Sequence, residues 1–346
     1  MKALIFHEPG RIAVEDAPDR TPGSGEALLR VGAAAICHSD IRVYQGQKHA
    51  RPGVIPGHEI AATVEAVGAG VESPRVGDRV VVCPIVSCGR CIFCVNGRRQ
   101  RCHERRTLGY DDDGGLAERL LVPAAIVSLG HLLPVPDGLS LERAAVTEPI
   151  ACVLNSLETC GITAGSSLAV IGGGPMGLFH VLLARALGAG VIVVSEPDEQ
   201  RSEFARKLGA TTVLDPRRDD LVSIVKERTG GLGADAVVIS AGITQALDAS
   251  LACVARQGVV NLFAGFPPNS SVALDPNAVH YSEVRLTGSQ NASPDQYRRV
   301  LQLLPHLPEA DTITTHRFPL ADATAAYEVR LRNEGLKSMV LVGAAT

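Results

Sequence analysis

The chain has 346 residues, of which 46% are hydrophobic and 20% are charged, and its formal net charge is -4. This length exceeds one ordinary hydrophobic core and favours two domains, and the composition is that of a globular protein. The negative charge gives no reason to expect binding to nucleic acid or to a membrane. The chain has no apolar run of about 18 residues, and charges appear as early as Lys2 and Glu8, so we expect a cytoplasmic protein.

Residues 1–150 contain short apolar segments separated by glycine and proline, a pattern typical of a β-rich barrel or sandwich. We expect strands at residues 27–31, 59–67 and 79–82. Gly77 and Asp78 predict a turn that leads into the last of these strands.

Residues 151–288 show apolar strands that alternate with helices, which predicts a parallel, doubly wound sheet. The expected strands are residues 167–171, 191–194, 212–214, 236–239, 259–263 and 284–287. The expected helices are residues 178–187, 220–229 and 245–256. Residues 289–346 add a helix at 295–303 and a strand at 339–342. The predicted fold class is therefore α/β, with a β-rich domain followed by a dinucleotide-binding domain of the Rossmann type.

A glycine-rich segment lies between the first strand and the first helix of this second domain. Gly172, Gly174 and Gly177 satisfy G-x-G-x-x-G, with Pro175 and Met176 before the last glycine. The motif is weak by itself, but within a βαβ unit it favours binding of a dinucleotide. Glycine permits the tight turn and the close approach of the pyrophosphate, which the helix N-terminus then faces.

Glu196 follows the second strand of this unit, at the position where an acidic side chain accepts hydrogen bonds from the adenosine ribose. A carboxylate there repels a 2'-phosphate, so we expect NAD rather than NADP. The alternative is that Glu196 is a surface residue that begins the turn Glu196-Pro197-Asp198.

Four cysteines lie close together within residues 83–106. Cys88, Cys91, Cys94 and Cys102 have the spacing C-x2-C-x2-C-x7-C, which allows four thiolates to bind one structural zinc ion. Disulfides or inert thiols are the alternative, and a cytoplasmic location disfavours the first of these. The arginines nearby could indicate a nucleic-acid module, but without interleaved aromatic residues a solvated loop is the better interpretation.

The stretch from Cys37 to Glu59 holds a second set of zinc-ligating side chains. Cys37, His58 and Glu59 supply a thiol, an imidazole and a carboxylate, and a catalytic zinc takes three protein ligands and keeps one position open. A buried cysteine with a hydrogen-bonded histidine is the alternative interpretation. Glu148, which precedes Pro149 at the boundary between the predicted domains, is a candidate for a further ligand.

Together these motifs resemble the zinc-containing medium-chain alcohol dehydrogenases, and within them the polyol, sorbitol and threonine dehydrogenase branch. The resemblance covers nearly the whole chain. It implies a GroES-like catalytic domain at residues 1–150, an inserted NAD-binding domain at 151–288, and a segment at 289–346 that returns to the first domain. It also implies a catalytic zinc at Cys37 and His58, with either Glu59 or Glu148 as a direct ligand.

The resemblance implies roles for four further residues. Ser39 is expected to touch the substrate oxygen and relay its proton, and Asp40 is expected to orient the zinc-bound histidine unless it is only a turn residue. Arg201 is expected to pair with the acidic residue at the adenosine ribose. Arg42 stands where some relatives have a relay histidine, so it either faces a polar substrate or is a solvated side chain.

We therefore expect an enzyme with NAD, one catalytic zinc and one structural zinc, which oxidises a secondary alcohol of a polyol, cyclitol or aminocyclitol reversibly to a ketone. The alternatives are a threonine-type or other hydroxy-compound dehydrogenase, a biosynthetic ketone reductase, and a non-catalytic relative that acts as a binding protein. The expected partner is a small polar alcohol or ketone. A homo-oligomer, dimer or tetramer, is also expected, with residues 284–287 as a candidate edge strand.

Overall fold

The computed structural model describes residues 1–342, which form two compact units. The split unit comprises Met1–Ala151 together with the described residues from Ala292 onward. The inserted unit comprises Cys152–Asn291. No helix within residues 1–342 is long and apolar enough to cross a membrane.

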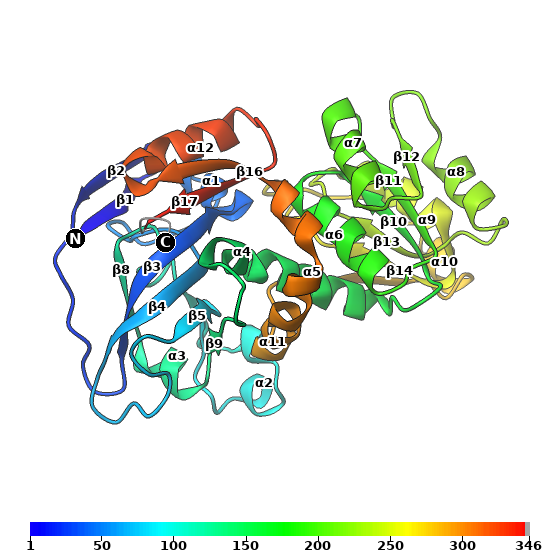
Figure 1. Cartoon of the computed structure of the whole chain (residues 1–346). Coiled ribbons are helices and arrows are strands. Elements are labelled where there is room, and N and C mark those ends of the chain that lie inside the picture. The colour runs from blue at the N-terminus through cyan, green and yellow to red at the C-terminus, as the bar shows by residue number, and fades with distance from the viewer. Residues whose placement is uncertain (343–346) are drawn as a thin grey trace. The chain divides into compact units, whose positions relative to one another are not determined.

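A seven-stranded sheet forms the centre of the split unit (Figure 1). Its strand order is β16, β17, β3, β4, β5, β9, and β8 also pairs with β3. The pair of β16 and β17 is parallel, and the other pairs are antiparallel. The strands are β3 (Ala27–Ile36), β4 (Glu59–Val67), β5 (Arg79–Val82), β8 (Arg119–Val122), β9 (Leu132–Pro134), β16 (Thr314–Pro319) and β17 (Lys337–Leu341).

The long strand β3 bends in its middle and pairs with different partners in its two halves. Residues 27–30 pair with β8, whereas residues 33–36 pair with β17. The register shifts between Val31 and Ala33, around Gly32. A Cβ atom on Gly32 would come within 2.4 Å of the Leu141 side chain, so the glycine allows close packing at this bend. The C-terminal end of β3 leads directly into Cys37.

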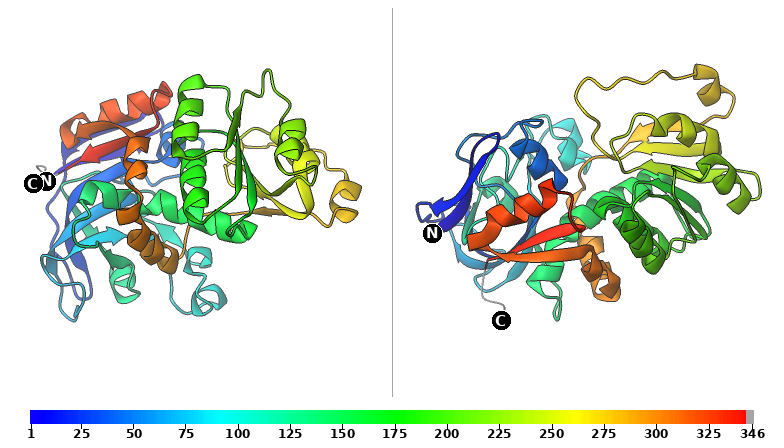
Figure 2. Two further views of the ribbon diagram at one scale, coloured as in Figure 1. Left: turned by 45° about the vertical axis from the view of Figure 1, so that its right-hand side comes forward. Right: turned by 90° about the horizontal axis from the view of Figure 1, so that it is seen from above.

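Short elements surround this sheet. The strands β1 (Lys2–Glu8) and β2 (Arg11–Asp16) form an antiparallel pair, and α12 lies on β16 and β17 and contacts α1 (Figure 2). The other elements are α1 (His38–Tyr44), β6 (Ile85–Val86), α2 (Ile92–Val95), β7 (Arg106–Thr107), α3 (Ala124–Ser128), α4 (Leu141–Ala145), α11 (Pro294–Leu303), α12 (Ala323–Leu331), and the 3₁₀ turns Arg99–Arg101, Leu304–His306, Pro308–Ile313 and Leu320–Asp322. Helix α5 (Thr147–Cys160) begins in the split unit and ends in the inserted unit.

The inserted unit contains a parallel six-stranded sheet, in the order β12, β11, β10, β13, β14, β15. Helix α6 packs beside α7, and α8 packs beside α9, so that helices flank the sheet (Figures 1 and 2). This arrangement confirms the predicted doubly wound α/β fold. The elements are β10 (Ser167–Ile171), α6 (Pro175–Ala186), β11 (Val191–Ser195), α7 (Glu199–Leu208), β12 (Thr212–Leu214), α8 (Leu221–Arg228), β13 (Ala234–Ile239), α9 (Ala246–Cys253), β14 (Val254–Leu262), α10 (Pro276–His280) and β15 (Arg285–Gly288).

The helix predicted at residues 245–256 is wrong at its C-terminal end. Helix α9 ends at Cys253, and β14 begins at the next residue. Val254 pairs with Ala234 of β13, and the register shifts before the main part of the strand because Gln257 adopts a positive φ of 61°. The β-branched side chain of Val254 suits the sheet, and this tertiary pairing overrides the helical pattern.

A buried network of polar side chains runs through the inserted unit. His180 of α6 is 0% exposed; its Nδ1 donates to the Met176 carbonyl oxygen at 2.7 Å, and its Nε2 lies 2.8 Å from Ser156 Oγ. Asn261 Nδ2 donates to Ser156 Oγ at 2.8 Å and to Ser289 Oγ at 3.0 Å. Burial lowers the pKa of His180 to about 4 because the charged imidazolium is desolvated.

The depressed pKa of His180 predicts a loss of stability in acid. As pH falls from 6.5 towards about 4, the unfolded chain binds a proton at this residue and the folded chain does not. The free energy of unfolding should fall by up to about 1.4 kcal/mol per pH unit in that window from this group. Urea unfolding of wild type and His180→Gln at pH 5 and pH 7 measures the effect. We expect the free energy of unfolding to change less between the two pH values in the variant than in wild type. Equal changes in the two proteins would contradict the prediction.

Candidate functional site

Cys37 lies where β3 ends and helix α1 begins. Its φ and ψ are -84° and 155°, and its backbone N–H donates to Asp40 Oδ2 at 2.9 Å. An acidic side chain at the third helical position that returns to the N-cap is a recognised way to begin a helix. This turn fixes the positions of Cys37, Ser39 and Asp40 at the start of α1.

His58 reaches the same place from the turn before β4. The preceding Gly57 has φ 91°, which favours glycine, and His58 is 5% exposed. Its Nδ1 lies 3.2 Å from Asp40 Oδ1. Burial lowers the pKa of His58, but the charges of Asp40 and Cys37 outweigh that and raise it well above the ordinary value. The surroundings therefore stabilise a positive charge at this point, as a cation-binding site requires.

The ligand atoms of Cys37, His58 and Glu59 all lie within 4.8 Å of one another. A thiolate, an imidazole and a carboxylate at this separation fit a zinc ion, and Asp40 beside Nδ1 leaves Nε2 of His58 as the ligand atom. The structure thus brings together three of the residues that the sequence assigns to a catalytic zinc.

The two candidate glutamates differ in their surroundings. Glu59, at the start of β4, is 0% exposed, and Lys337 Nζ lies 2.8 Å from its Oε1 and 2.6 Å from its Oε2. Glu148 lies in the first turn of α5 and is 8% exposed. Within residues 1–342, Glu148 is not part of the 4.8 Å group, although its charge helps to raise the pKa of Tyr110.

Two hydroxyl groups lie beside these ligands. Ser39 Oγ and the Tyr110 hydroxyl are 2.6 Å apart, and the Tyr110 hydroxyl lies 3.5 Å from His58 Nε2. Burial, together with the charges of Asp40 and Cys37, raises the pKa of Tyr110 well above its ordinary value. The tyrosine therefore stays protonated and can donate a hydrogen bond.

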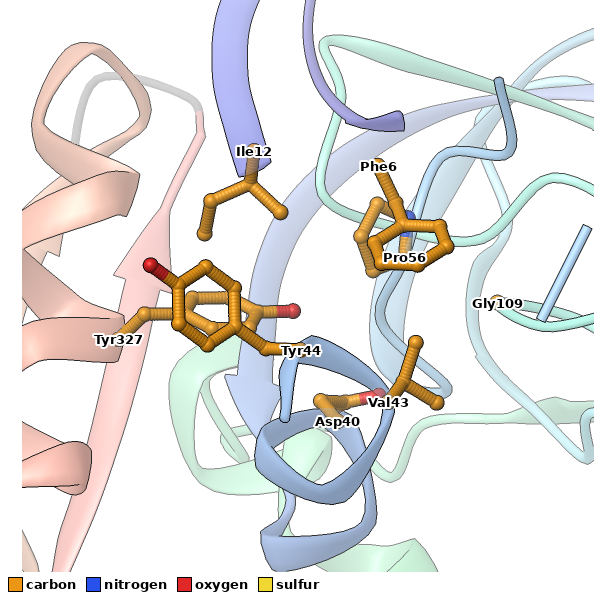
Figure 3. Close-up of a pocket in the computed structure, with 8 residues that line it drawn as sticks. All are labelled: Phe6, Ile12, Asp40, Val43, Tyr44, Pro56, Gly109 and Tyr327. Atoms are coloured by element: carbon orange, nitrogen blue, oxygen red, sulfur yellow. The ribbon is translucent and has the colours of Figure 1, made fainter. Parts of the chain in front are cut away.

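A small cavity lies behind Asp40, on the inner side of α1 (Figure 3). Its volume is about 10 Å³, which is just enough for one water molecule. Figure 3 shows that it is enclosed mainly by apolar and aromatic side chains, which are Phe6, Ile12, Val43, Tyr44, Pro56 and Tyr327. This cavity is too small to hold a polyol.

The four-cysteine cluster forms as the spacing indicates. The sulfur atoms of Cys88, Cys91, Cys94 and Cys102 lie within 4.8 Å of one another. Helix α2 holds Cys94 close to Cys91, with 3.5 Å between their sulfur atoms, and the β6–β7 pair closes the loop at its base. Backbone hydrogen bonds lower the pKa of Cys91 to about 6, which favours a thiolate, whereas burial raises the pKa of Cys94 to about 12. This donor set fits a tetrahedral zinc ion.

The glycine-rich segment forms the turn between β10 and α6. Gly172 has φ 102°, and a Cβ on Gly177 would lie 1.9 Å from the Gly172 carbonyl oxygen. A Cβ on Gly174 would meet nothing within 4 Å, so open space lies before the N-terminus of the helix. Pro175 is the first residue of α6 and Met176 the second. This geometry fits the pyrophosphate of a dinucleotide.

Glu196 directly follows β11 and turns back to the glycine turn. Its Oε2 accepts from the Gly173 N–H at 2.6 Å, and its Oε1 accepts from the Asp198 N–H at 2.9 Å. The residue is 5% exposed, so the interpretation as a surface residue fails. Arg201 lies in the first turn of α7, where its backbone N–H donates to the Asp198 side chain.

Three residues beside the candidate zinc site do not follow from the sequence motifs. Tyr110 and Lys48 come from irregular segments, and Lys337 begins the last strand. Lys337 stands 278 residues from Glu59 along the chain. Lysine is almost never buried without a partner, so the burial of Lys337 could be predicted from the sequence only if its partner Glu59 were already known.

Comparisons with known proteins agree with these features. Residues 23–137 match the alcohol dehydrogenase GroES-like domain, and residues 175–305 match the zinc-binding dehydrogenase domain. Sorbitol dehydrogenase of Bacillus subtilis (strain 168) is 32% identical, over 98% of this chain and 97% of the relative. D-arabitol-phosphate dehydrogenase of Enterococcus avium is 31% identical, over 98% of this chain and 97% of the relative. The crystal structure of a Sinorhizobium meliloti 1021 protein bound to NADP superposes with a TM-score of 0.90 at 30% identity, over 99% of both chains.

Proposed function

Because the chain belongs to the zinc-binding dehydrogenase family, we propose that it oxidises a secondary alcohol of a polyol, cyclitol or aminocyclitol to a ketone, reversibly and with NAD. The observation that carries the proposal is the pair of Ser39 and Tyr110 hydroxyls, 2.6 Å apart, beside the carboxylate-containing ligand set. Hydroxyl groups at this point suit a substrate rich in hydroxyls better than a simple apolar alcohol.

Each residue of the site then has a defined task. Cys37 and His58 would hold the zinc together with Glu59 or Glu148, and zinc supplies Lewis-acid polarisation of a substrate oxygen when bound. Asp40 Oδ1, 3.2 Å from His58 Nδ1, would orient the imidazole ring. Ser39 Oγ would accept a hydrogen bond from the substrate hydroxyl and relay its proton, releasing its own hydroxyl proton to solvent water as it does so.

The glycine turn and Glu196 would bind the dinucleotide. The Glu196 carboxylate is held by two backbone N–H groups at the turn, where it can accept from a ribose hydroxyl and repel a 2'-phosphate. A structural neighbour holds NADP, so the choice between the two cofactors is the point to test.

Replacing Glu196 with glutamine or alanine should lower the preference for NAD over NADP by roughly 10- to 100-fold in kcat/KM, because the charge that repels the phosphate is removed. Glu199→Ala is the matched control, since it removes the same charge from an exposed residue of α7 that pairs with Arg206 at 3.0 Å. An unchanged ratio in both Glu196 variants would contradict the assignment.

The proposed reaction is tested by a screen of zinc-loaded protein against sorbitol and other polyols, inositols, aminocyclitols and threonine, with NADH absorbance as the readout. Turnover of a polyol or a cyclitol supports the proposal. Turnover of threonine alone would assign the threonine-type activity instead, and reduction of a ketone without alcohol oxidation would indicate a biosynthetic reductase.

We also propose a homo-oligomer that uses the edge of the inserted sheet. The edge strand β15 pairs on one side with β14, and Leu286 within it is 37% exposed. An unpaired strand edge is a ready site for pairing with a second chain. Light scattering after size exclusion should give a dimer or a tetramer, and a monomer at micromolar concentration would refute the proposal.

A further inference from the structure

A lysine lies one side chain beyond the hydroxyl pair of the candidate catalytic site. Lys48 Nζ is 3.5 Å from the centre of the Tyr110 ring, and the Tyr110 hydroxyl is 2.6 Å from Ser39 Oγ. The order serine, tyrosine, lysine therefore leads outward from the ligands of the proposed zinc. None of the zinc motifs includes Lys48.

The backbone places this lysine firmly. The N–H groups of Gln47 and Lys48 both donate to the Arg42 carbonyl oxygen, at 2.8 Å and 3.2 Å. Arg42 belongs to α1, the helix that begins at Cys37, so the loop that carries Lys48 is anchored to the helix that carries Ser39. On the other side, the Arg51 N–H donates to the Tyr110 carbonyl oxygen at 2.8 Å.

The charge of Lys48 has no direct counterpart within residues 1–342, where no carboxylate forms an ion pair with it. Desolvation of the ammonium lowers the pKa of Lys48. The negative charges of Asp40 and Cys37 raise this pKa, and the positive charges of Arg105 and Arg42 lower it further. Asp40 is already bonded to the Cys37 N–H and faces His58. Both carboxylate oxygens of Asp40 are therefore already engaged, and the Cys37 thiolate would be engaged by the metal, so neither of these anions is left to pair with Lys48.

Contact with the ring explains the position of Lys48 only in part. A cation over an aromatic ring contributes only modestly to stability where the residue is exposed, as Lys48 is. The ammonium is partly desolvated against the ring, but because the residue is exposed a ligand can still reach it from solvent. A substrate whose reacting hydroxyl meets Ser39 and whose chain extends along the Tyr110 ring would bring a group a few bonds away to Lys48.

We propose that Lys48 is a specificity-determining residue that selects a polyol bearing an anionic group, a carboxylate or a phosphate, over a neutral polyol. The ammonium would bind the anionic oxygens by charge-assisted hydrogen bonds, and Arg42 and Arg105 would add to the positive potential around them. This inference rests on the proposed function and narrows its substrate class.

The test compares a neutral polyol, an aldonate and a polyol phosphate of the same carbon number, with NADH formation as the readout. We expect wild type to prefer one of the two anionic probes, which also tells carboxylate from phosphate. Lys48→Met should lower the ratio of kcat/KM for that probe to kcat/KM for the neutral polyol by roughly 10- to 100-fold, mainly through KM, and Lys48→Arg should retain most of the preference. Lys2→Met removes the same charge from β1 and should leave the ratio unchanged.

A wild-type preference for the neutral polyol, or an unchanged ratio in Lys48→Met, would overturn the role of Lys48 while leaving the proposed function intact. Absence of NADH formation with every alcohol would instead contradict the proposed function. In that case, calorimetric binding of the anionic probes to zinc-loaded protein with NADH still decides the role of Lys48. Weaker binding to Lys48→Met than to wild type supports it, and equal binding refutes it.

Discussion

Replacing Cys37 with alanine should lower kcat/KM by roughly a thousandfold or more, because Lewis-acid catalysis by a metal lowers the activation barrier by several kcal/mol. Cys37, His58 and Glu59 are the donors that lie within 4.8 Å of one another, and alanine removes the sulfur from this set. Zinc content should fall from about two ions per chain to about one, since the four-cysteine cluster remains complete.

Two measurements make this result specific. Binding of NADH, followed by its fluorescence, should be unchanged in Cys37→Ala, because the glycine turn belongs to the inserted unit. Cys160→Ala is the matched control, since this buried thiol is not part of either metal-binding group among residues 1–342. Retained turnover in a Cys37→Ala preparation with one zinc ion per chain would refute the catalytic site.

Replacing Lys337 with methionine should destabilise the split unit by about 3–5 kcal/mol, the usual cost of leaving one member of a buried ion pair without its partner. Glu59 is 0% exposed and Lys337 is 4% exposed, so water cannot replace the lost ammonium. The methionine side chain preserves most of the volume, which limits the contribution of a cavity. Chemical unfolding of the metal-free protein, followed by circular dichroism, measures the change.

The double variant Glu59→Gln with Lys337→Met separates the charge from the packing. Both charges are then absent, and we expect the double variant to be more stable than Lys337→Met alone. A double variant as unstable as the single one would show that packing around Lys337, rather than the ion pair, accounts for the loss.

Local features made the inserted unit predictable. The strands at residues 167–171 and 212–214 match β10 and β12 because continuous β-branched and apolar runs between turn residues have few other structures available. The boundary between α9 and β14 could not be read in this way. Val254 belongs to the strand because Ala234, twenty residues earlier, pairs with it.

The candidate zinc sites show the same distinction. The four cysteines lie within one short loop, so their spacing alone predicts the cluster. The residues next to Cys37 and His58 in the sequence also form recognisable motifs. The contacts of Tyr110 with Ser39 and of Lys337 with Glu59 join residues far apart in the chain, and only the tertiary fold brings them together. A contact between residues so far apart in the chain leaves no pattern in a short stretch of sequence.

The position of β17 has a consequence for the order in which a nascent chain can fold. This strand lies between β3 and β16, yet it comes from residues 337–341, after the whole inserted unit has left the ribosome. Until then residues 33–36 of β3 lack the partner on one edge, and Glu59 lacks its ammonium. The split unit is therefore the first to be synthesised and the last to be completed, and its open apolar edge is the segment most exposed to aggregation in the meantime.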